Sequence, residues 1–152
     1  MSEPASQLHP PTDRPRRILY AEDVRELRDV ARMIVAPMGF VLDCAENGQI
    51  ALERVQADPT IYDLIITDHH MPVMNGLEFV MMLRGLPYAG KVLVFSSDLN
   101  PGTAVLYRNL NVDRILNKPV APQIFRQVVA ELVQSGPAGG QPPAAGGASV
   151  KS

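Results

Sequence analysis

Five short apolar segments alternate with five segments of helical periodicity through most of this 152-residue chain. The apolar segments are rich in β-branched residues and are typical of strands that are buried on both faces. Such an alternation predicts an α/β fold, in which right-handed crossovers join parallel strands and helices cover both faces of the sheet. The five predicted strands cover residues 16–21, 40–45, 64–66, 92–95 and 112–116.

The segments between these strands carry the start and stop signals of helices. Asp23 and Glu26 form a D-x-x-E start, and Asn75 can cap a helix with Glu78 three residues on. Apolar residues in the first and last helical segments recur at i, i+3, i+4 and i+7, which indicates one buried face. The predicted helices begin near Asp23, Asn47, Asn75, Asn100 and Pro122, and the first four end near Pro37, Ala57, Gly85 and Leu110.

Proline and glycine mark the limits of the folded part. Four of the 14 prolines fall in residues 1–15 and three in residues 135–152. The second of these segments is almost wholly Ser, Gly, Pro, Ala and Gln, a composition that buries too little apolar surface to become ordered. We therefore predict a disordered N-terminal arm (1–15), one folded domain (16–134) and a disordered Gly/Pro/Ala-rich tail (135–152).

The overall composition narrows the functional classes. Fourteen basic and 16 acidic residues leave a net charge of −2, which argues against DNA binding because nucleic-acid-binding faces are strongly basic. The single cysteine, Cys44, excludes an internal disulfide and is expected to be a packed thiol. No apolar run approaches the ~20 residues of a membrane helix, and the N-terminus lacks the apolar core of a signal peptide. We expect a cytoplasmic protein without a membrane segment.

Charged and polar side chains stand at the ends of the predicted strands. Glu22 and Asp23 follow the first strand, and Asp68 follows the third. An acid at the mouth of a buried strand is costly unless it is paired, bound to metal or reactive. Ser96 ends the fourth strand, and Lys118 follows the fifth. In sheets of this kind ligands bind beyond the carboxyl ends of the strands, so these side chains are expected to form one site.

The three carboxylates of this predicted site need a counter-charge. Like charges a few ångströms apart cannot all stay ionised without one, and Mg²⁺ suits best because carboxylates and water are its preferred ligands. Lys118 supplies a positive point charge, and Ser96 supplies a hydroxyl donor. Together these groups would stabilise a phosphoryl group on, or arriving at, Asp68, since a carboxylate can act as a nucleophile toward phosphorus.

Four sequence segments at these positions resemble the receiver domains of two-component response regulators. The resemblance spans nearly all of residues 16–134. It implies a flavodoxin-like (βα)5 three-layer sandwich with a five-stranded parallel sheet in the order 2-1-3-4-5. The four segments are ILYAED (18–23), LIITDHHMPVMNG (64–76), LVFSS (93–97) and LNKP (116–119).

The resemblance also implies a role for each site residue. Asp68 resembles the phosphoacceptor, Ser96 the hydroxyl switch residue, and Lys118 the lysine that precedes a cis peptide bond to Pro119. The implied cofactor is Mg²⁺. Its implied ligands are Glu22, Asp23, Asp68 and the backbone carbonyl of His70.

The function implied by this resemblance is that of a single-domain, chemotaxis-regulator-like response regulator. Such a protein takes a phosphoryl group from a histidine kinase or histidine phosphotransfer protein, catalyses only its own phosphorylation and dephosphorylation, and signals through contacts with a downstream protein, which the sequence leaves unknown. The fourth helix, fifth strand and fifth helix form the partner face, where a homodimer can also form. The initial Met and the two flanking arms favour a whole protein over a fragment of a hybrid kinase.

Two features depart from the family pattern. Ile115 stands where members often carry Tyr or Phe, so the usual aromatic switch is not expected and output would depend on Ser96 and the loops. His69 and His70 are unusual neighbours of the acceptor. Adjacent residues in extended structure point opposite ways, so we predict no transition-metal site there. We instead hypothesise that His70, with Asp98, sets how fast water removes the phosphoryl group.

Three other functions remain to be weighed against this one. A receiver-like docking module that works without phosphorylation is kept open by Ile115. An aspartate-nucleophile phosphohydrolase usually needs a second Asp where His70 stands, so the residues favour it less. A flavin carrier of the same fold would need a Ser/Thr/Gly-rich loop after the first strand, where Glu22 and Asp23 would repel a phosphate.

Overall fold

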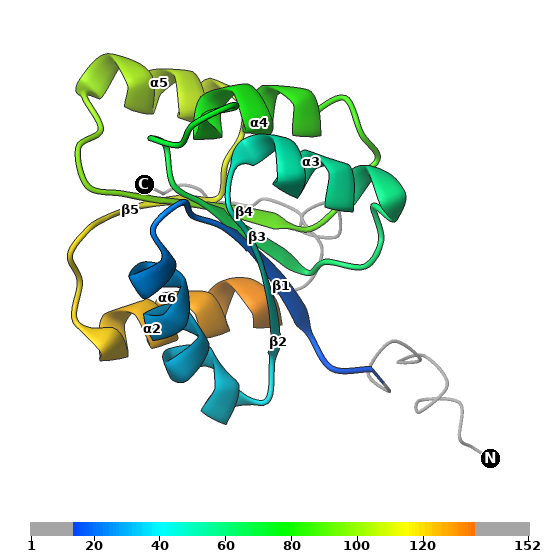
Figure 1. Ribbon diagram of the computed structural model, residues 1–152, viewed down its shortest axis with the longest axis vertical. Helices are drawn as coiled ribbons and strands as arrows, with labels where there is room; N and C mark the ends of the chain where they lie inside the picture. Colours follow the sequence, from blue (N-terminus) through cyan, green and yellow to red (C-terminus); the bar gives the residue numbers. More distant parts are fainter. Residues whose placement is uncertain (1–13, 136–152) are drawn as a thin grey trace.

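Five parallel strands form one sheet in the order β2-β1-β3-β4-β5, as the computed structural model of the protein shows (Figure 1). The structure describes residues 14–135. The predicted strand order is confirmed, and every neighbouring pair in the sheet is parallel. The strands are β1 (Arg17–Ala21), β2 (Val41–Ala45), β3 (Leu64–Thr67), β4 (Lys91–Ser96) and β5 (Arg114–Asn117).

Helices cover both faces of the sheet, which gives the predicted three-layer sandwich. Helices α3, α4 and α5 lie on one face, and α2 and α6 lie on the other (Figure 1). A 3-10 turn, η2, follows α2 and contains Pro37. The helices and this turn are α2 (Arg25–Val35), η2 (Ala36–Met38), α3 (Gly48–Ala57), α4 (Gly76–Leu83), α5 (Pro101–Asn109) and α6 (Pro122–Gln134).

The hydrophobic core has two layers, one on each face of the sheet. Successive side chains of a strand point to opposite faces, and β1 shows the consequence. Leu19 and Ala21 pack in the layer that includes residues of α3 and α4, whereas Ile18 and Tyr20 pack in the layer that includes residues of α2 and α6. All four are buried. Burial on both faces fixes the strand register, so the residues after β1 and β3 leave the sheet at fixed positions.

Asparagine side chains cap three helices as the sequence predicts. Asn47, Asn75 and Asn100 each accept a hydrogen bond from a backbone N–H in the first turn, and Asn75 forms a full capping box with Glu78. The predicted start of the first helix at Asp23 is wrong. Its cap is Val24, which makes no side-chain capping bond, because Asp23 lies in the acidic pocket instead of capping the helix.

Strand boundaries also differ from the sequence-based prediction by one or two residues, most of all at the start of β5. Strand β4 begins at Lys91, and β5 begins at Arg114 instead of Val112. Residues 112 and 113 lie in the turn that precedes β5, where the carboxylate of Asp113 accepts a hydrogen bond from the backbone N–H of Val92 at 2.8 Å. A side chain thus takes the place of a ladder bond at the start of the strand, and a pattern of apolar residues does not reveal such a contact.

The predicted disordered arms, residues 1–15 and 135–152, lie almost entirely outside the described residues, so they stay predictions. The domain limits of 16–134 likewise stay a prediction. Among the helices within residues 14–135, none is both long enough and apolar enough to cross a bilayer.

Gly76, at the first position of α4, has no room for a side chain. A Cβ at this position would collide with the backbone carbonyl of Asp68 and with the Tyr107 hydroxyl. The backbone N–H of Gly76 donates to the carbonyl of His69 at 2.9 Å. The close approach therefore ties the start of α4 to the residues that follow β3.

We expect Gly76→Ala to lower the free energy of unfolding by at least about 2 kcal/mol, because overpacking against backbone forces the chain to move. Gly102→Ala is the matched control, since a Cβ there meets one atom at an ordinary contact distance of 3.4 Å. That change should leave stability unchanged or raise it by up to about 1 kcal/mol. Urea unfolding of both variants measures the difference, and equal effects would contradict the argument.

Candidate functional site

Three carboxylates meet at the carboxyl ends of β1 and β3. One oxygen each from Glu22, Asp23 and Asp68 lies within 4.8 Å of the others. Backbone bonds continue the sheet into these residues, because Glu22 N donates to Ala45 O at 2.9 Å and Asp68 N donates to Ala21 O at 3.0 Å. Glu22 and Asp68 are buried, whereas Asp23 is exposed. The predicted acidic cluster is therefore held by the sheet itself.

Lys118 supplies the positive charge beside this cluster. Its Nζ lies 2.6 Å from Glu22 Oε1 and 3.4 Å from Asp68 Oδ2. Its backbone N–H donates to the carbonyl of Ser96 at 3.0 Å, which places the residue at the end of β5. The predicted cis peptide bond between Lys118 and Pro119 is present. One cation thus bridges two of the three acids.

The carboxylate of Glu22 is fully buried and fully hydrogen-bonded. Its Oε1 accepts from the Tyr20 hydroxyl at 3.1 Å as well as from Lys118, and its Oε2 accepts from the backbone N–H of Val24 at 3.0 Å. Burial raises the pKa of Glu22, and the bonds from Lys118 and Val24 oppose that rise. A buried charge with all its partners in place keeps one orientation, so Glu22 is a fixed wall of the pocket.

The side chain of Ser96 is polar and buried, and it makes no hydrogen bond within the described residues. It is 1% exposed, and its Oγ has no hydrogen-bond partner within residues 14–135. A buried hydroxyl of this kind costs about 1–3 kcal/mol when it stays unsatisfied. It stands at the end of β4, between β3 and β5 in the sheet. Such a donor fits an oxygen atom of an incoming anionic group.

The two adjacent histidines do not point in opposite directions, so the premise of that argument is wrong, and the absence of a transition-metal site there stays a prediction. The rings of His69 and His70 meet edge to face, with 4.8 Å between their centroids. The chain leaves the extended conformation after β3, so the alternation of a strand no longer applies. His70 is exposed, and its side chain makes no hydrogen bond within the described part of the chain. Its backbone carbonyl as a metal ligand stays a prediction.

Two tyrosines of the site were not predicted. Tyr20 donates to Glu22, and the Tyr107 hydroxyl lies 2.7 Å from His69 Nδ1. The sequence did contain one signal for these contacts, namely the residue type, because a buried tyrosine needs a hydrogen-bond partner for its hydroxyl. Burial lowers the pKa of His69 and raises the pKa of Tyr107. The Tyr107 hydroxyl can donate to Nδ1 when the His69 ring carries its proton on Nε2.

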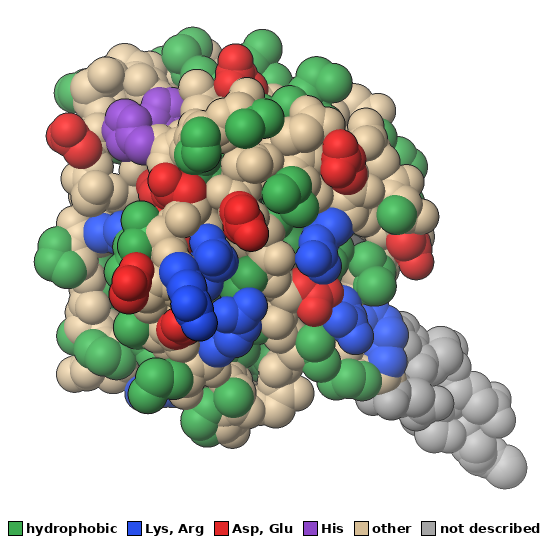
Figure 2. All heavy atoms as spheres, viewed as in Figure 1, with side chains coloured by type: hydrophobic (Ala, Val, Ile, Leu, Met, Phe, Trp, Pro, Cys, Tyr) green, Lys and Arg blue, Asp and Glu red, His purple; other side chains and the backbone are tan. Residues whose placement is uncertain are grey.

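The surface around the site carries charge of both signs. Figure 2 shows acidic side chains close to the two histidines, and Lys and Arg side chains gathered over α2. Helix α2 contributes Arg25, Arg28 and Arg32. Of these, Arg28 donates to the backbone carbonyl of Glu22 at 2.8 Å. The acidic pocket therefore has a second cationic side chain at its edge.

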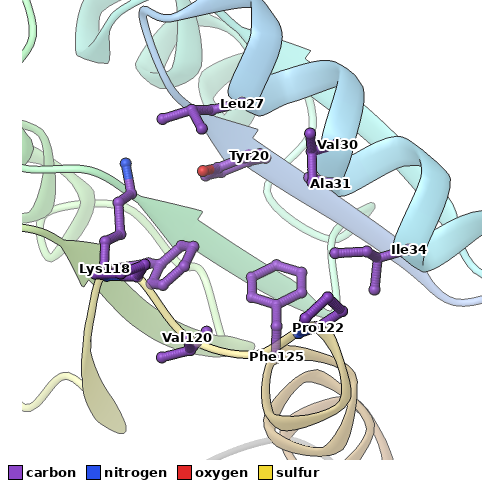
Figure 3. A pocket seen from close by; sticks show the side chains of 11 residues that line it. Tyr20, Leu27, Val30, Ala31, Ile34, Lys118, Val120, Pro122 and Phe125 are labelled. Atoms are coloured by element: carbon purple, nitrogen blue, oxygen red, sulfur yellow. The ribbon is translucent and has the colours of Figure 1, made fainter.

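The aliphatic stem of Lys118 lies at one end of an apolar cavity between α2 and α6 (Figure 3). Leu27 and Ile34 line it from α2, and Phe125 lines it from α6. The Lys118 Nζ also lies 5.4 Å from the ring centroid of Phe95. Long cationic side chains bury their stems against apolar surface while the charged end reaches a polar site, and this packing aims Lys118 at the acids.

We expect Lys118→Met to lower the free energy of unfolding by about 3–5 kcal/mol, because it leaves the buried charge of Glu22 without its partner. Adding Glu22→Gln to the same chain should recover part of this loss by removing that charge. Urea unfolding measures both effects.

The control for this pair is Arg114→Met, which removes an arginine 2.9 Å from Glu131 in an exposed ion pair at the start of β5. Its cost should stay near 1 kcal/mol or less. A loss in Lys118→Met no larger than in this control, or a further loss on adding Glu22→Gln, would contradict the assignment.

Comparison with known proteins identifies one family that matches most of the chain. The family model described as "Response regulator receiver domain" matches residues 18–130. The two-component response regulator ORR41 of Oryza sativa subsp. japonica is 33% identical over 118 residues, which is 76% of this chain and 93% of that protein. The alkaline phosphatase synthesis transcriptional regulatory protein SphR of Synechococcus elongatus is 30% identical over 110 residues, covering 68% of this chain and 43% of that protein.

Solved structures show the same fold. A CheY-like response regulator receiver domain protein from Methanospirillum hungatei JF-1 superposes with a TM-score of 0.76 at 20% identity, covering 80% of this chain and 96% of that one. Chemotaxis protein CheY4 of Vibrio cholerae gives a TM-score of 0.72 at 23% identity, covering 78% and 99%. Several curated relatives are much longer, since the chain spans only 5% of hybrid signal transduction histidine kinase M of Dictyostelium discoideum.

Proposed function

The chain belongs to the receiver domains of two-component response regulators, and from this premise we propose that it accepts a phosphoryl group on Asp68 and signals through protein contacts. Receiver domains interact with histidine kinases or phosphotransfer proteins. One observation carries the proposal, namely that the carboxylates of Glu22, Asp23 and Asp68 share a pocket with Lys118. A carboxylate at such a site can act as a nucleophile while neighbouring groups balance the charge of the transferred group.

The proposed step is a transfer between two side chains. A carboxylate oxygen of Asp68 forms a bond to phosphorus as the bond from phosphorus to the donor's histidine nitrogen breaks, and that nitrogen keeps the electron pair. Lys118 and the unpaired hydroxyl of Ser96 hold the phosphoryl oxygens. In a separate hydrolysis step, water attacks phosphorus, the Asp68 carboxylate leaves, and inorganic phosphate is released. The protein thus catalyses only its own modification and its removal.

Receiver domains bind Mg²⁺ at an acidic pocket, and the donor set of this chain fits that ion. Glu22, Asp23 and Asp68 provide hard oxygen ligands, which Mg²⁺ prefers. The exposed Asp23 leaves the pocket open toward solvent, so water can complete the coordination. The backbone carbonyl of His70 is the fourth proposed ligand. When bound, the ion supplies positive charge next to the phosphoryl oxygens.

The partners and the location of the protein are proposed only in general terms. The predicted contact face formed by α5, β5 and α6, its use for a homodimer, the cytoplasmic location and the absence of DNA binding stay predictions. No observation favours a docking module that works without phosphate, because the phosphoryl site is complete in its side chains. The family is a signalling domain, which also leaves the phosphohydrolase alternative without support.

Incubation with acetyl phosphate and Mg²⁺ should add the mass of one phosphoryl group to the wild-type protein, because the Asp68 carboxylate attacks phosphorus and acetate leaves. Asp68→Asn should add none, and removal of Mg²⁺ with a chelator should abolish the addition. Intact-mass spectrometry gives the answer directly.

The control for this experiment is Asp29→Asn, which changes an exposed acid on α2 and should be modified like the wild type. Equal modification of Asp68→Asn and wild type would refute the proposed acceptor.

We further expect His70→Asn to change the lifetime of the phosphoryl group severalfold, because the exposed side chain two residues past the acceptor lies on the approach path proposed for water. The phosphorylated proteins are isolated and followed over time by intact mass. His69→Asn would not serve as a control, because His69 bonds to Tyr107. Val73→Asn changes an exposed residue of the same loop and should leave the lifetime near that of the wild type. An identical lifetime for His70→Asn and the wild type would show that this histidine does not control hydrolysis.

A further inference from the structure

Tyr107 reaches from the inner face of α5 to the loop that carries the acceptor. Its side chain is fully buried, and its hydroxyl lies 2.7 Å from His69 Nδ1. The two rings meet edge to face, with 5.6 Å between their centroids. Within residues 14–135, no other side-chain hydrogen bond joins the loop 68–76 to α5. This contact is therefore the one side-chain hydrogen bond between the helix and the loop in the described part of the chain.

His69 is in turn bonded directly to the acceptor. Its backbone N–H donates to Asp68 Oδ1 at 2.7 Å, and its carbonyl accepts from Gly76 N at 2.9 Å. One residue therefore separates the acceptor carboxylate from the Tyr107 hydroxyl. Gly76 packs closely against this contact, because even a Cβ at its position would collide with both the Asp68 carbonyl and the Tyr107 hydroxyl. Closely packed groups pass displacements on instead of absorbing them.

Apart from this contact, helix α5 is held at its C-terminal end, where Arg84 donates to the carbonyl of Leu110 at 2.7 Å. It buries only Ala104 and Tyr107, whereas α6 buries five residues. Val105 and Leu106, on the outer side of α5, are about half exposed. An element with few buried apolar contacts opens at low free energy. Loss of the Tyr107 hydrogen bond should therefore be visible in this helix before any other.

Position 115 does not provide the link that the family often has there. Ile115 has no polar atom in its side chain and packs partly buried against the core layer of α3 and α4. A route from the acceptor to the α5 surface must then use other side chains, and the Tyr107–His69 contact is the one that the hydrogen bonds supply.

We propose that Tyr107 is a positioning residue whose hydroxyl, through His69, couples the phosphorylation state of Asp68 to helix α5. This inference rests on the function proposed above. The bond ties α5 to the loop while Asp68 is a free carboxylate, and phosphorylation releases it.

The physical reason for release is the change of charge at Asp68. Phosphorylation of one carboxylate oxygen turns the carboxylate into an acyl phosphate and removes the negative charge from the other oxygen, so the bond from His69 N–H loses its charge-assisted strength. The phosphoryl group meanwhile places about −1.5 to −2 charges beside His69. Both changes draw the N–H groups of His69 toward the phosphoryl oxygens and turn its ring away from Tyr107.

Amide hydrogen exchange of residues 101–109, read by mass spectrometry or NMR, tests this coupling. In the wild type, phosphorylation with acetyl phosphate and Mg²⁺ should speed exchange in α5 by about fivefold, the effect of one ordinary hydrogen bond. Tyr107→Phe keeps the ring and removes only the hydroxyl. Its α5 should exchange fast without phosphate and change little on phosphorylation.

A matched control and a second variant make the test decisive. Tyr88→Phe removes another buried hydroxyl, which bonds to Lys91 O at 2.7 Å at the start of β4, and its α5 should behave like the wild type. His69→Phe breaks the same bond from the loop side and should reproduce Tyr107→Phe, without a further increase in the double variant. It also answers the question if Tyr107→Phe does not fold.

The outcomes separate this inference from the proposed function. If wild-type protein takes up no phosphoryl group, the proposed function fails and the coupling fails with it. If the wild type is phosphorylated but α5 exchange stays constant, or if Tyr107→Phe behaves like Tyr88→Phe, the coupling alone is overturned and the acceptor role of Asp68 stands.

Discussion

The ion pair between Glu22 and Lys118 is the interaction on which the site depends. Glu22 follows β1 and Lys118 follows β5, with β3 and β4 between them in the sheet, so their strands are about 14 Å apart at ordinary spacing. Only a long, flexible cation can span that gap. The parallel strand order is therefore a condition of the chemistry, because it places this lysine within 2.6 Å of Glu22 and 3.4 Å of Asp68.

The free site has energetic costs that a bound anion and a bound cation would reduce. Three acids crowd one pocket, and the Ser96 hydroxyl has no partner within the described residues. Groups held in place before a ligand arrives need no rearrangement during the reaction, so these costs are consistent with function.

Much of this architecture follows from patterns within single segments. The apolar runs predict the strands, and the acids, Ser96 and Lys118 at their ends predict the site. Local patterns mislead where a distant contact overrides a local rule. Asp23 belongs to the acidic pocket and does not cap α2, and the histidine pair turns because the strand has ended. Tyr107 went unrecognised because its partner is 38 residues away, a separation that no periodicity encodes.

The two oxygens of the acceptor carboxylate are already distinguished in the free protein. Oδ1 accepts the backbone N–H of His69 at 2.7 Å, whereas Oδ2 faces the ammonium of Lys118 at 3.4 Å. A carboxylate is symmetric in water, but here its environment makes the two lone-pair sets inequivalent. Under the proposed function, this inequivalence would determine which oxygen attacks phosphorus, and with it the side of the pocket from which a donor protein approaches.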